Sequence, residues 1–315
     1  MKKLVLAAAL ALTAGPVSAQ SYGPPASPAF TVQETRQSFF TLQDAVRAIG
    51  AGRGTISIAP GRYEECAVQE EGQISYLAAQ PGRVILDSVT CEQKAALVLR
   101  GRSAHVEGIV FQNLQVPDGN GAGIRIEKGD LTVRESLFRN SHSGILSASD
   151  PNGRIRIERS TFSGLGRCDG DLACAHAVYI GDYGALSIAN SRFERGTGGH
   201  YVKTRTPRIE VVDSSFDDSA GRDTNYMIDL SNGASGLIAR NMFVQGVNKE
   251  NYSAMITVGA EGRDNDSSGL LVRDNQAELA PEARRTSFVA DLTGARLQIA
   301  NNRLDRQITE LERRR

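Results

Sequence analysis

The chain has 315 residues, and its 36 lysines and arginines balance 36 aspartates and glutamates. A net charge of zero excludes the basic excess typical of nucleic-acid-binding proteins, so no nucleic-acid partner is expected. Tryptophan is absent, so the 8 tyrosines must take over any aromatic stacking that Trp would provide on a ligand. The length allows two ordinary domains or one elongated solenoid.

Residues 1–19 have the three-part pattern of a secretory signal peptide. A basic start precedes the uncharged apolar run Leu4–Ala14, Pro16 interrupts it, and small residues lead to Ala19. We therefore expect cleavage near Ala19 and a secreted or periplasmic protein, with residues 20–37 as a linker. A buried N-terminal helix is the alternative. The apolar run is shorter than the roughly 20 residues that span a bilayer, and no later run is long enough, so no membrane span is expected.

The four cysteines suggest disulfides, because an even number in an exported chain usually pairs. Their order favours Cys66–Cys91, at about one repeat length, and Cys168–Cys174, which would close a small loop. A metal site is the alternative, but the spacings do not match a zinc pattern.

A short pattern recurs along the chain: alternating apolar residues, a polar pair and then an aromatic residue. Examples are LTVRESLF from Leu131, IRIERSTF from Ile155, LSIANSRF from Leu186 and IEVVDSSF from Ile209. The aromatic positions are Phe111, Phe138, Phe162, Phe193, Phe216 and Phe243, with gaps of 23 to 31 residues. A repeat of this length indicates one supersecondary unit that is stacked many times.

The repeat predicts an all-β fold, a right-handed parallel β-helix spanning residues 38–305. Alternation with a period of two indicates strands, and the irregular gaps suit a solenoid whose coils can extend single loops. A β-sandwich is the main alternative. A short capping helix is expected at Thr41–Ile49, and residues 306–315 should form a charged tail or a second cap.

A second strand precedes each copy of the repeat, and its copies can be aligned as rows of neighbouring residues. Three of these copies are AVYIGD from Ala177, HYVKTR from His200 and YMIDLS from Tyr226. The alignment places Tyr179 in the core. On the outward face it places Lys203 beside Asp229 and Arg205 beside Asp182, about 4.8 Å apart.

The aligned strands bring chemically active side chains together on consecutive coils. His200 should lie beside Tyr226, and the mixture of imidazole, amine, guanidinium, phenol and carboxylate is a general acid–base set. The candidate catalytic residues are His200, Lys203, Arg205 and Asp229. The candidate substrate-binding residues are Tyr226, Asp182, Tyr201, Asn232 and Glu261. The alternative is a plain ladder of ion pairs on a solvated face.

Other polar residues have mainly structural expectations. His105 and His142 lie at turns or strand starts, whereas His176 could line the same groove as His200. Turn asparagines should form a stacked hydrogen-bonded ladder. These asparagines are Asn190, Asn241, Asn275 and Asn302.

The segments TLQDAV and GTISIAPGRYEE resemble the N-terminal coil of secreted pectate-lyase-like β-helix proteins, and the repeats from Phe111 to Leu304 resemble their later coils. The similarity covers most of the expected mature chain and is more specific for fold than for function. The segments HAVYIG, GGHYVKTR and NYMIDLSNG resemble a bacterial group of such proteins. The resemblance implies a protein that acts on an acidic polysaccharide, and we expect a monomer.

Three functions fit these residues, and the first is a polysaccharide lyase. β-Elimination needs a base, for which Lys203 or His200 is suited, and a cation for the uronate carboxylate, for which Arg205 is suited. Tyr226 or His200 could donate the proton to the leaving oxygen. No cofactor is required, although calcium is possible through Asp182, Asp229 and Glu261.

The second function is an inverting glycoside hydrolase of the polygalacturonase type, with Asp182 and Asp229 as its two carboxylates. GGHYVKTR is loosely similar to elements of that family, but the paired-aspartate motifs of the family are not found. The third function is a polysaccharide-binding periplasmic protein without catalysis.

Overall fold

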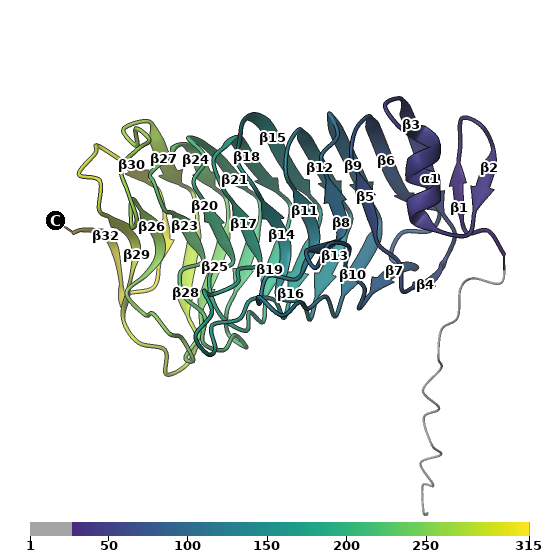
Figure 1. Cartoon of the computed structure of the whole chain (residues 1–315). Helices are drawn as coiled ribbons and strands as arrows, with labels where there is room; N and C mark the ends of the chain where they lie inside the picture. Colours follow the sequence, from purple (N-terminus) through teal and green to yellow (C-terminus); the bar gives the residue numbers. More distant parts are fainter. Residues whose placement is uncertain (1–26, 315) are drawn as a thin grey trace, which may run out of the picture.

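The computed structural model describes residues 27–314. It is an elongated stack of β-strand coils with one helix, α1 (Leu42–Ile49), at its N-terminal end (Figure 1). The expected signal peptide and the cleavage position near Ala19 lie outside the described residues. Within residues 27–314, no helix is long and apolar enough to cross a membrane.

The strands form three sheets that run the length of the stack. The sheet that we call sheet A has 12 strands. In spatial order they are β2 (Gln37–Phe39), β1 (Phe30–Val32), β3 (Arg53–Ile58), β6 (Gln73–Ala78), β9 (Ser103–Glu107), β12 (Asp130–Arg134), β15 (Asp150–Glu158), β18 (Tyr183–Ala189), β21 (Arg208–Val212), β24 (Ser235–Ala239), β27 (Leu270–Arg273) and β30 (Gln298–Ala300).

Sheets B and C have 10 strands each. Sheet B contains β4 (Gly61–Tyr63), β7 (Val84–Asp87), β10 (Ile109–Gln112), β13 (Leu137–Arg139), β16 (Thr161–Ser163), β19 (Arg192–Glu194), β22 (Ser215–Asp217), β25 (Met242–Gln245), β28 (Gln276–Leu279) and β31 (Arg303–Leu304). Sheet C contains β5 (Ala67–Gln69), β8 (Ala95–Leu99), β11 (Ala122–Ile126), β14 (Ser143–Ser147), β17 (Val178–Ile180), β20 (Val202–Thr204), β23 (Ile228–Leu230), β26 (Ala254–Val258), β29 (Thr286–Asp291) and β32 (Ile308–Arg313).

Each coil adds one strand to each sheet. For example, β9, β10 and β11 follow one another along the chain, and they pair in parallel with β12, β13 and β14 of the next coil. Parallel strands of this kind need a crossover between them, and here the crossover is the rest of the coil. The predicted parallel β-helix is confirmed and the sandwich is excluded, while the right-handed sense stays a prediction.

The recurring phenylalanines form a stacked column inside the solenoid. Consecutive rings from Phe111 to Phe243 lie 4.8 to 5.0 Å apart and within 7° of parallel. All six side chains are buried. The spacing equals the distance between neighbouring strands, so the parallel register dictates the stack.

A second column, made of polar residues, lies at the turns between sheets A and B. Asn241 Nδ2 donates to Asn275 Oδ1 at 3.0 Å, and Asn275 Nδ2 donates to Asn302 Oδ1 at 2.9 Å. This part of the expected asparagine ladder is confirmed. Asn190 is not in it: its backbone has a φ of 50°, and the next residue, Ser191, takes the ladder position. Asparagine tolerates this left-handed conformation, which explains its place in the turn.

Both ends of the solenoid are closed by secondary structure. Thr41 caps α1 and accepts a hydrogen bond from the Asp44 amide, as expected. Part of the expected linker 20–37 is strand: it contains β1, which pairs antiparallel with β3, and its last residue begins β2. The C-terminal segment is a cap made of strand, since β32 pairs in parallel with β29.

Both expected disulfides are present. Cys66–Cys91 joins two neighbouring coils beside sheet C, and Cys168–Cys174 closes the loop between β16 and β17. The described residues contain no free cysteine. The pairing inferred from residue order is therefore confirmed.

Candidate functional site

The outward face of sheet C carries the candidate residues on β17, β20 and β23. Val178 pairs with Val202, so Tyr179 pairs with Lys203, and Lys203 pairs with Asp229. The expected core position of Tyr179 is therefore wrong by one residue. Because Ala177 and Val178 are both apolar, the local alternation fits two registers, and the correct one turns Tyr179 outward.

Lys203 is the centre of the cluster. Its Nζ lies 3.6 Å from Asp229 Oδ2, as the alignment predicted, and it also forms an ion pair with Glu261. The ammonium group lies 5.7 Å from the centroid of the Tyr179 ring, within cation–π range. Two carboxylates and an aromatic face thus surround one amine.

Arg205 forms the second cation of the cluster. Its Nε donates to the Tyr179 hydroxyl at 3.1 Å, and its terminal nitrogens contact Asn232 and Glu261. The expected contact with Asp182 is wrong, since the register places Asp182 outside this row. Asp182 instead lies 3.5 Å from the Ser149 hydroxyl.

Glu261 bridges the two cations. Its two carboxylate oxygens contact Lys203 and Arg205, one oxygen each. Its partial burial raises the pKa, but the hydrogen bonds from Lys203 and Arg205 outweigh this effect and hold the pKa of Glu261 below its ordinary value. Glu261 and Asn232 therefore lie beside the other candidate residues, while their expected role in substrate binding stays a prediction.

His200 lies beside Tyr226 as predicted, with ring centroids 5.5 Å apart. Its Nδ1 lies 3.0 Å from the Nδ1 of His176, and its Nε2 lies 3.8 Å from Asp229 Oδ2. Burial and then the charge of Lys203 lower the pKa of His200 to about 3. Burial, His200 and Lys203 also lower the pKa of His176 well below its ordinary value. Both rings are therefore neutral at neutral pH.

The cluster is largely buried, which contradicts the expectation of a solvent-facing patch. The exposed fraction of the side chain is 2% for Asp229, 8% for Lys203 and 10% for His200. It rises to 25% for Arg205 and 41% for Glu261. The cluster is therefore reached from the side of Arg205 and Glu261.

Asp229 is a buried acceptor behind Lys203. Its two oxygens accept hydrogen bonds from the hydroxyls of Ser231, at 2.8 Å, and Thr257, at 2.9 Å. Burial raises the pKa of Asp229, and the charge of Lys203 opposes this shift. With three polar partners and almost no exposure, Asp229 orients Lys203 and does not reach the surface.

The loops that precede β20, β23 and β26 form a wall beside the cluster, and a buried ion pair holds them together. Lys249 Nζ lies 3.1 Å from Asp218 Oδ2 and 3.2 Å from the Thr224 hydroxyl. The Tyr201 hydroxyl donates to Asp218 Oδ1 at 2.7 Å, and the Tyr201 side chain is buried. The Tyr201 hydroxyl thus serves this inner network, and the substrate-binding role expected for Tyr201 stays a prediction.

Sequence reasoning missed three residues of this region. Tyr179 could have been found by sliding its strand by one residue, which aligns Val178 with Val202. No local sequence pattern indicates that Asp218 and Lys249 interact, because they are 31 residues apart and come together only where their loops stack. The remaining histidines contact their neighbours: His105 Nε2 lies 2.8 Å from Glu107 Oε2, and His142 Nδ1 accepts from the Gly121 amide at 3.2 Å. Their expected structural role stays a prediction.

A preformed metal site is absent from the described residues, where no group of three His, Cys, Asp or Glu side chains is placed to hold a metal ion. Asp182 lies apart from Asp229 and Glu261, so the oxygen set expected for calcium is not assembled. Calcium enters no step below.

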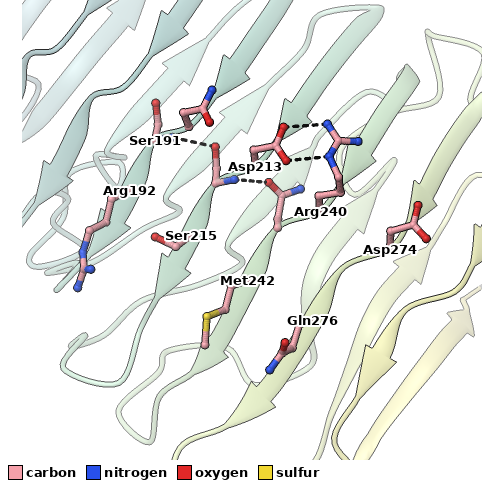
Figure 2. Close-up of a pocket in the computed structure, with 11 residues that line it drawn as sticks. Ser191, Arg192, Asp213, Ser215, Arg240, Met242, Asp274 and Gln276 are labelled. Atoms are coloured by element: carbon pink, nitrogen blue, oxygen red, sulfur yellow. Dashed lines mark hydrogen bonds and ion pairs between the residues drawn. The ribbon is translucent and has the colours of Figure 1, made fainter.

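A separate depression, of about 620 Å³, lies across the turns between sheets A and B. Figure 2 shows that two of its charged groups are paired with each other: both carboxylate oxygens of Asp213 accept from Arg240, at 2.7 and 2.8 Å. The serine and asparagine ladder passes through the same region, where Ser191 N donates to Ser214 Oγ at 3.0 Å. These hydrogen bonds and ion pairs join neighbouring coils to one another, so we do not take this depression as the candidate site.

No protein-family model matches the chain, and no curated protein matches its sequence. Similar solved structures include ORF18 of Geobacillus virus E2 (15% identity, TM-score 0.45), which covers 86% of this chain, while the chain spans only 58% of the viral protein. The Streptococcus pneumoniae surface protein and adhesin PfbA has 11% identity and a TM-score of 0.39, covering 86% of this chain and 94% of that one. The catalytic unit of a GH87 alpha-1,3-glucanase from Streptomyces thermodiastaticus strain HF3-3 has 14% identity and a TM-score of 0.28, covering 95% and 70%.

Proposed function

We propose that the protein is a polysaccharide lyase that cleaves an acidic polysaccharide by β-elimination at the outward face of sheet C. The observation that carries this proposal is the meeting of two cations, a neutral imidazole and a tyrosine hydroxyl. Lys203 and Arg205 supply the cations, His200 the imidazole and Tyr179 the hydroxyl. These are the groups that elimination beside a carboxylate requires.

The cation pair suits the carboxylate of a uronic acid residue. The proton on C5 becomes more acidic when the neighbouring carboxylate is neutralised, because negative charge develops on that carboxylate in the transition state. Lys203 and Arg205 already hold one carboxylate, that of Glu261, in a two-point bridge. A uronate in the same place would receive the same two contacts.

We assign the proton transfers to the neutral side chains of His200 and Tyr179. Lys203 contacts the carboxylates of Asp229 and Glu261, so we assign it to binding the substrate carboxylate and not to the role of base. His200 carries a free lone pair at neutral pH. Tyr179, which accepts a hydrogen bond from Arg205, is placed to donate a proton to the leaving oxygen. Tyr226 is the second candidate donor, through its stack on His200.

We also propose that the protein acts outside the cytoplasm. Its two disulfides persist in oxidising compartments, and residues 1–19 have the composition of an export signal. Polymeric acidic sugars are available in those compartments.

The experiment is a depolymerisation assay on polygalacturonate and alginate, with dextran as a neutral control and with arms containing calcium or a chelator. A lyase produces ultraviolet absorbance from the new C4=C5 double bond. His200→Ala and Arg205→Lys should each lower the rate at least about 10²-fold, since one base or one bidentate clamp is lost.

The control variant is Arg192→Ala, an exposed arginine on β19 outside the cluster, which should keep full activity. Reducing ends without absorbance would replace the lyase with a hydrolase. Retention of the polymer with neither product would replace it with a binding protein.

A further inference from the structure

The two neighbouring histidines of the cluster form a direct ring-to-ring contact. The Nδ1 atoms of His176 and His200 are 3.0 Å apart, and their ring centroids are 4.7 Å apart. Two neutral imidazoles can share such a contact only if one nitrogen carries the hydrogen and the other carries the lone pair. The assignment of that hydrogen decides which nitrogen of His200 is left as a base.

The backbone settles the assignment. The amide N–H of His200 donates to His176 Nδ1 at 3.0 Å. A nitrogen that accepts this bond bears no hydrogen, so neutral His176 carries its hydrogen on Nε2. The bond between the rings must then be donated by His200 Nδ1. The opposite assignment would place two donors against each other and leave the His200 amide without this acceptor, which is unfavourable for a donor shielded from water.

The remaining nitrogen of His200, Nε2, therefore bears the lone pair. It lies 3.8 Å from Asp229 Oδ2, and the charged groups that act on the ring are Lys203, Lys249 and Glu261. Lys203 and Lys249 disfavour a proton on the ring, whereas Glu261 and a hydrogen bond with the Asn225 side chain favour one. Tyr226 covers the ring face. Nε2 is thus an unprotonated acceptor directed at the cluster.

We propose that His176 is a positioning residue that holds His200 in the Nδ1–H tautomer, so that His200 Nε2 is the base of the reaction. The kinetic part of this inference rests on the proposed lyase function. The C5 proton passes to Nε2, the C5 electrons form the C4=C5 double bond, and the bond from C4 to its oxygen breaks. The oxygen takes a proton from a tyrosine hydroxyl. The imidazolium that forms keeps its Nδ1–H bond to His176.

The chain contains 4 histidines, so nitrogen NMR of the labelled protein can read every tautomer without substrate. His142 provides an internal reference, because its Nδ1 accepts from the Gly121 amide at 3.2 Å and must bear the lone pair. His105 directs Nε2 at Glu107. We expect His200 to differ from the other three by carrying its hydrogen on Nδ1 in the neutral form. A hydrogen on His200 Nε2 would overturn the inference, whether or not the protein is a lyase.

Two substitutions of His176 distinguish a role in orienting His200 from a role in packing alone. His176→Asn keeps an acceptor at the position of Nδ1, whereas His176→Leu removes it. We expect His176→Leu to shift His200 toward the Nε2–H tautomer and to lower kcat about 10²-fold with KM changed less than about twofold. His176→Asn should retain the Nδ1–H tautomer and most of kcat. The matched control is His142→Asn, which should leave both unchanged.

The two possible failures are distinguishable. If the native protein shows no eliminase activity but His200 is in the Nδ1–H tautomer, the lyase proposal fails and the tautomer assignment stands. If the protein is a lyase and His176→Leu retains kcat and its pH profile, the positioning role of His176 is refuted.

Discussion

At the scale of single residues, the key feature is that Glu261 is ion-paired with Lys203 and Arg205, the two cations proposed to bind the substrate carboxylate. Its carboxylate is 41% exposed, so it can rotate toward solvent, while its backbone amide is anchored on the Ser231 carbonyl at 2.8 Å. The free protein thus holds an anion of its own at the carboxylate position. Binding of a uronate must displace this anion, which weakens the apparent affinity.

This competition predicts that Glu261→Gln tightens the binding of an oligogalacturonide. Exposed ion pairs contribute about 0–1 kcal/mol each, so removing the resident carboxylate should lower Kd roughly fivefold. Isothermal titration calorimetry with trigalacturonate at low salt measures this change. Asp264→Asn is the control. Asp264 lies on the same loop as Glu261, but its hydrogen bond is with the Asn232 side chain and not with Lys203 or Arg205. Weaker binding by Glu261→Gln would show that Glu261 contacts the sugar instead.

At the scale of elements, stability resides in columns that continue from coil to coil. Phe193 stacks on Phe162 and Phe216, both at 4.8 Å, and it also meets the Tyr201 ring edge-on at 6.5 Å. Tyr201 in turn donates to Asp218 in the loop wall. The phenylalanine column of sheet B therefore supports the wall beside the candidate site.

We expect Phe193→Ala to destabilise the protein by about 3–5 kcal/mol, because it removes a fully buried ring from the middle of the stack. Chemical denaturation followed by circular dichroism gives the free energy of unfolding. Phe40→Ala is the matched control, since Phe40 is 53% exposed in the N-terminal cap and should change stability by less than about 1 kcal/mol. Equal effects of the two substitutions would contradict the stacked column as the source of stability.

At the scale of the whole molecule, the buried neutral histidines make stability depend on pH. Unfolded histidine has a pKa of about 6.5. Burial lowers the pKa of His200 to about 3 and also lowers that of His176. Between these values the unfolded chain binds protons that the folded chain does not, so the free energy of unfolding falls as the pH falls below about 6.5.

The expected loss approaches about 1.4 kcal/mol per pH unit for each buried histidine. Thermal unfolding between pH 7 and pH 5 measures it, and His200→Gln should flatten the slope. His105→Gln is the control, because His105 is 29% exposed. Burial raises the pKa of Asp229, and this acts in the opposite direction, because a carboxyl whose pKa is higher in the folded than in the unfolded chain lowers the free energy of unfolding as the pH rises. An unchanged slope in His200→Gln would contradict the prediction.

The sequence by itself determined the repeat, and through it most of the fold. Alternating Val and Ile residues and phenylalanines at one position of each coil favour parallel strands stacked in register, because that arrangement buries all of those side chains in one continuous core. The two disulfides followed from residue order, and the N-terminal helix followed from its cap and apolar face. Two neighbouring pairs also followed from the aligned strands, Lys203 with Asp229 and His200 with Tyr226, since equal positions of adjacent parallel strands lie side by side.

Only the tertiary structure decided the depth and the partners of the site. A slip of one residue reverses the direction of every side chain in a strand, and this slip separated Asp182 from Arg205 and brought Tyr179 outward. Burial depends on the loops between strands, which have no repeat, so the enclosure of Lys203 and the inward direction of Tyr201 could not be foreseen. The His176–His200 contact arises for the same reason: these residues precede their strands, and only the packing of the loops brings the two rings together.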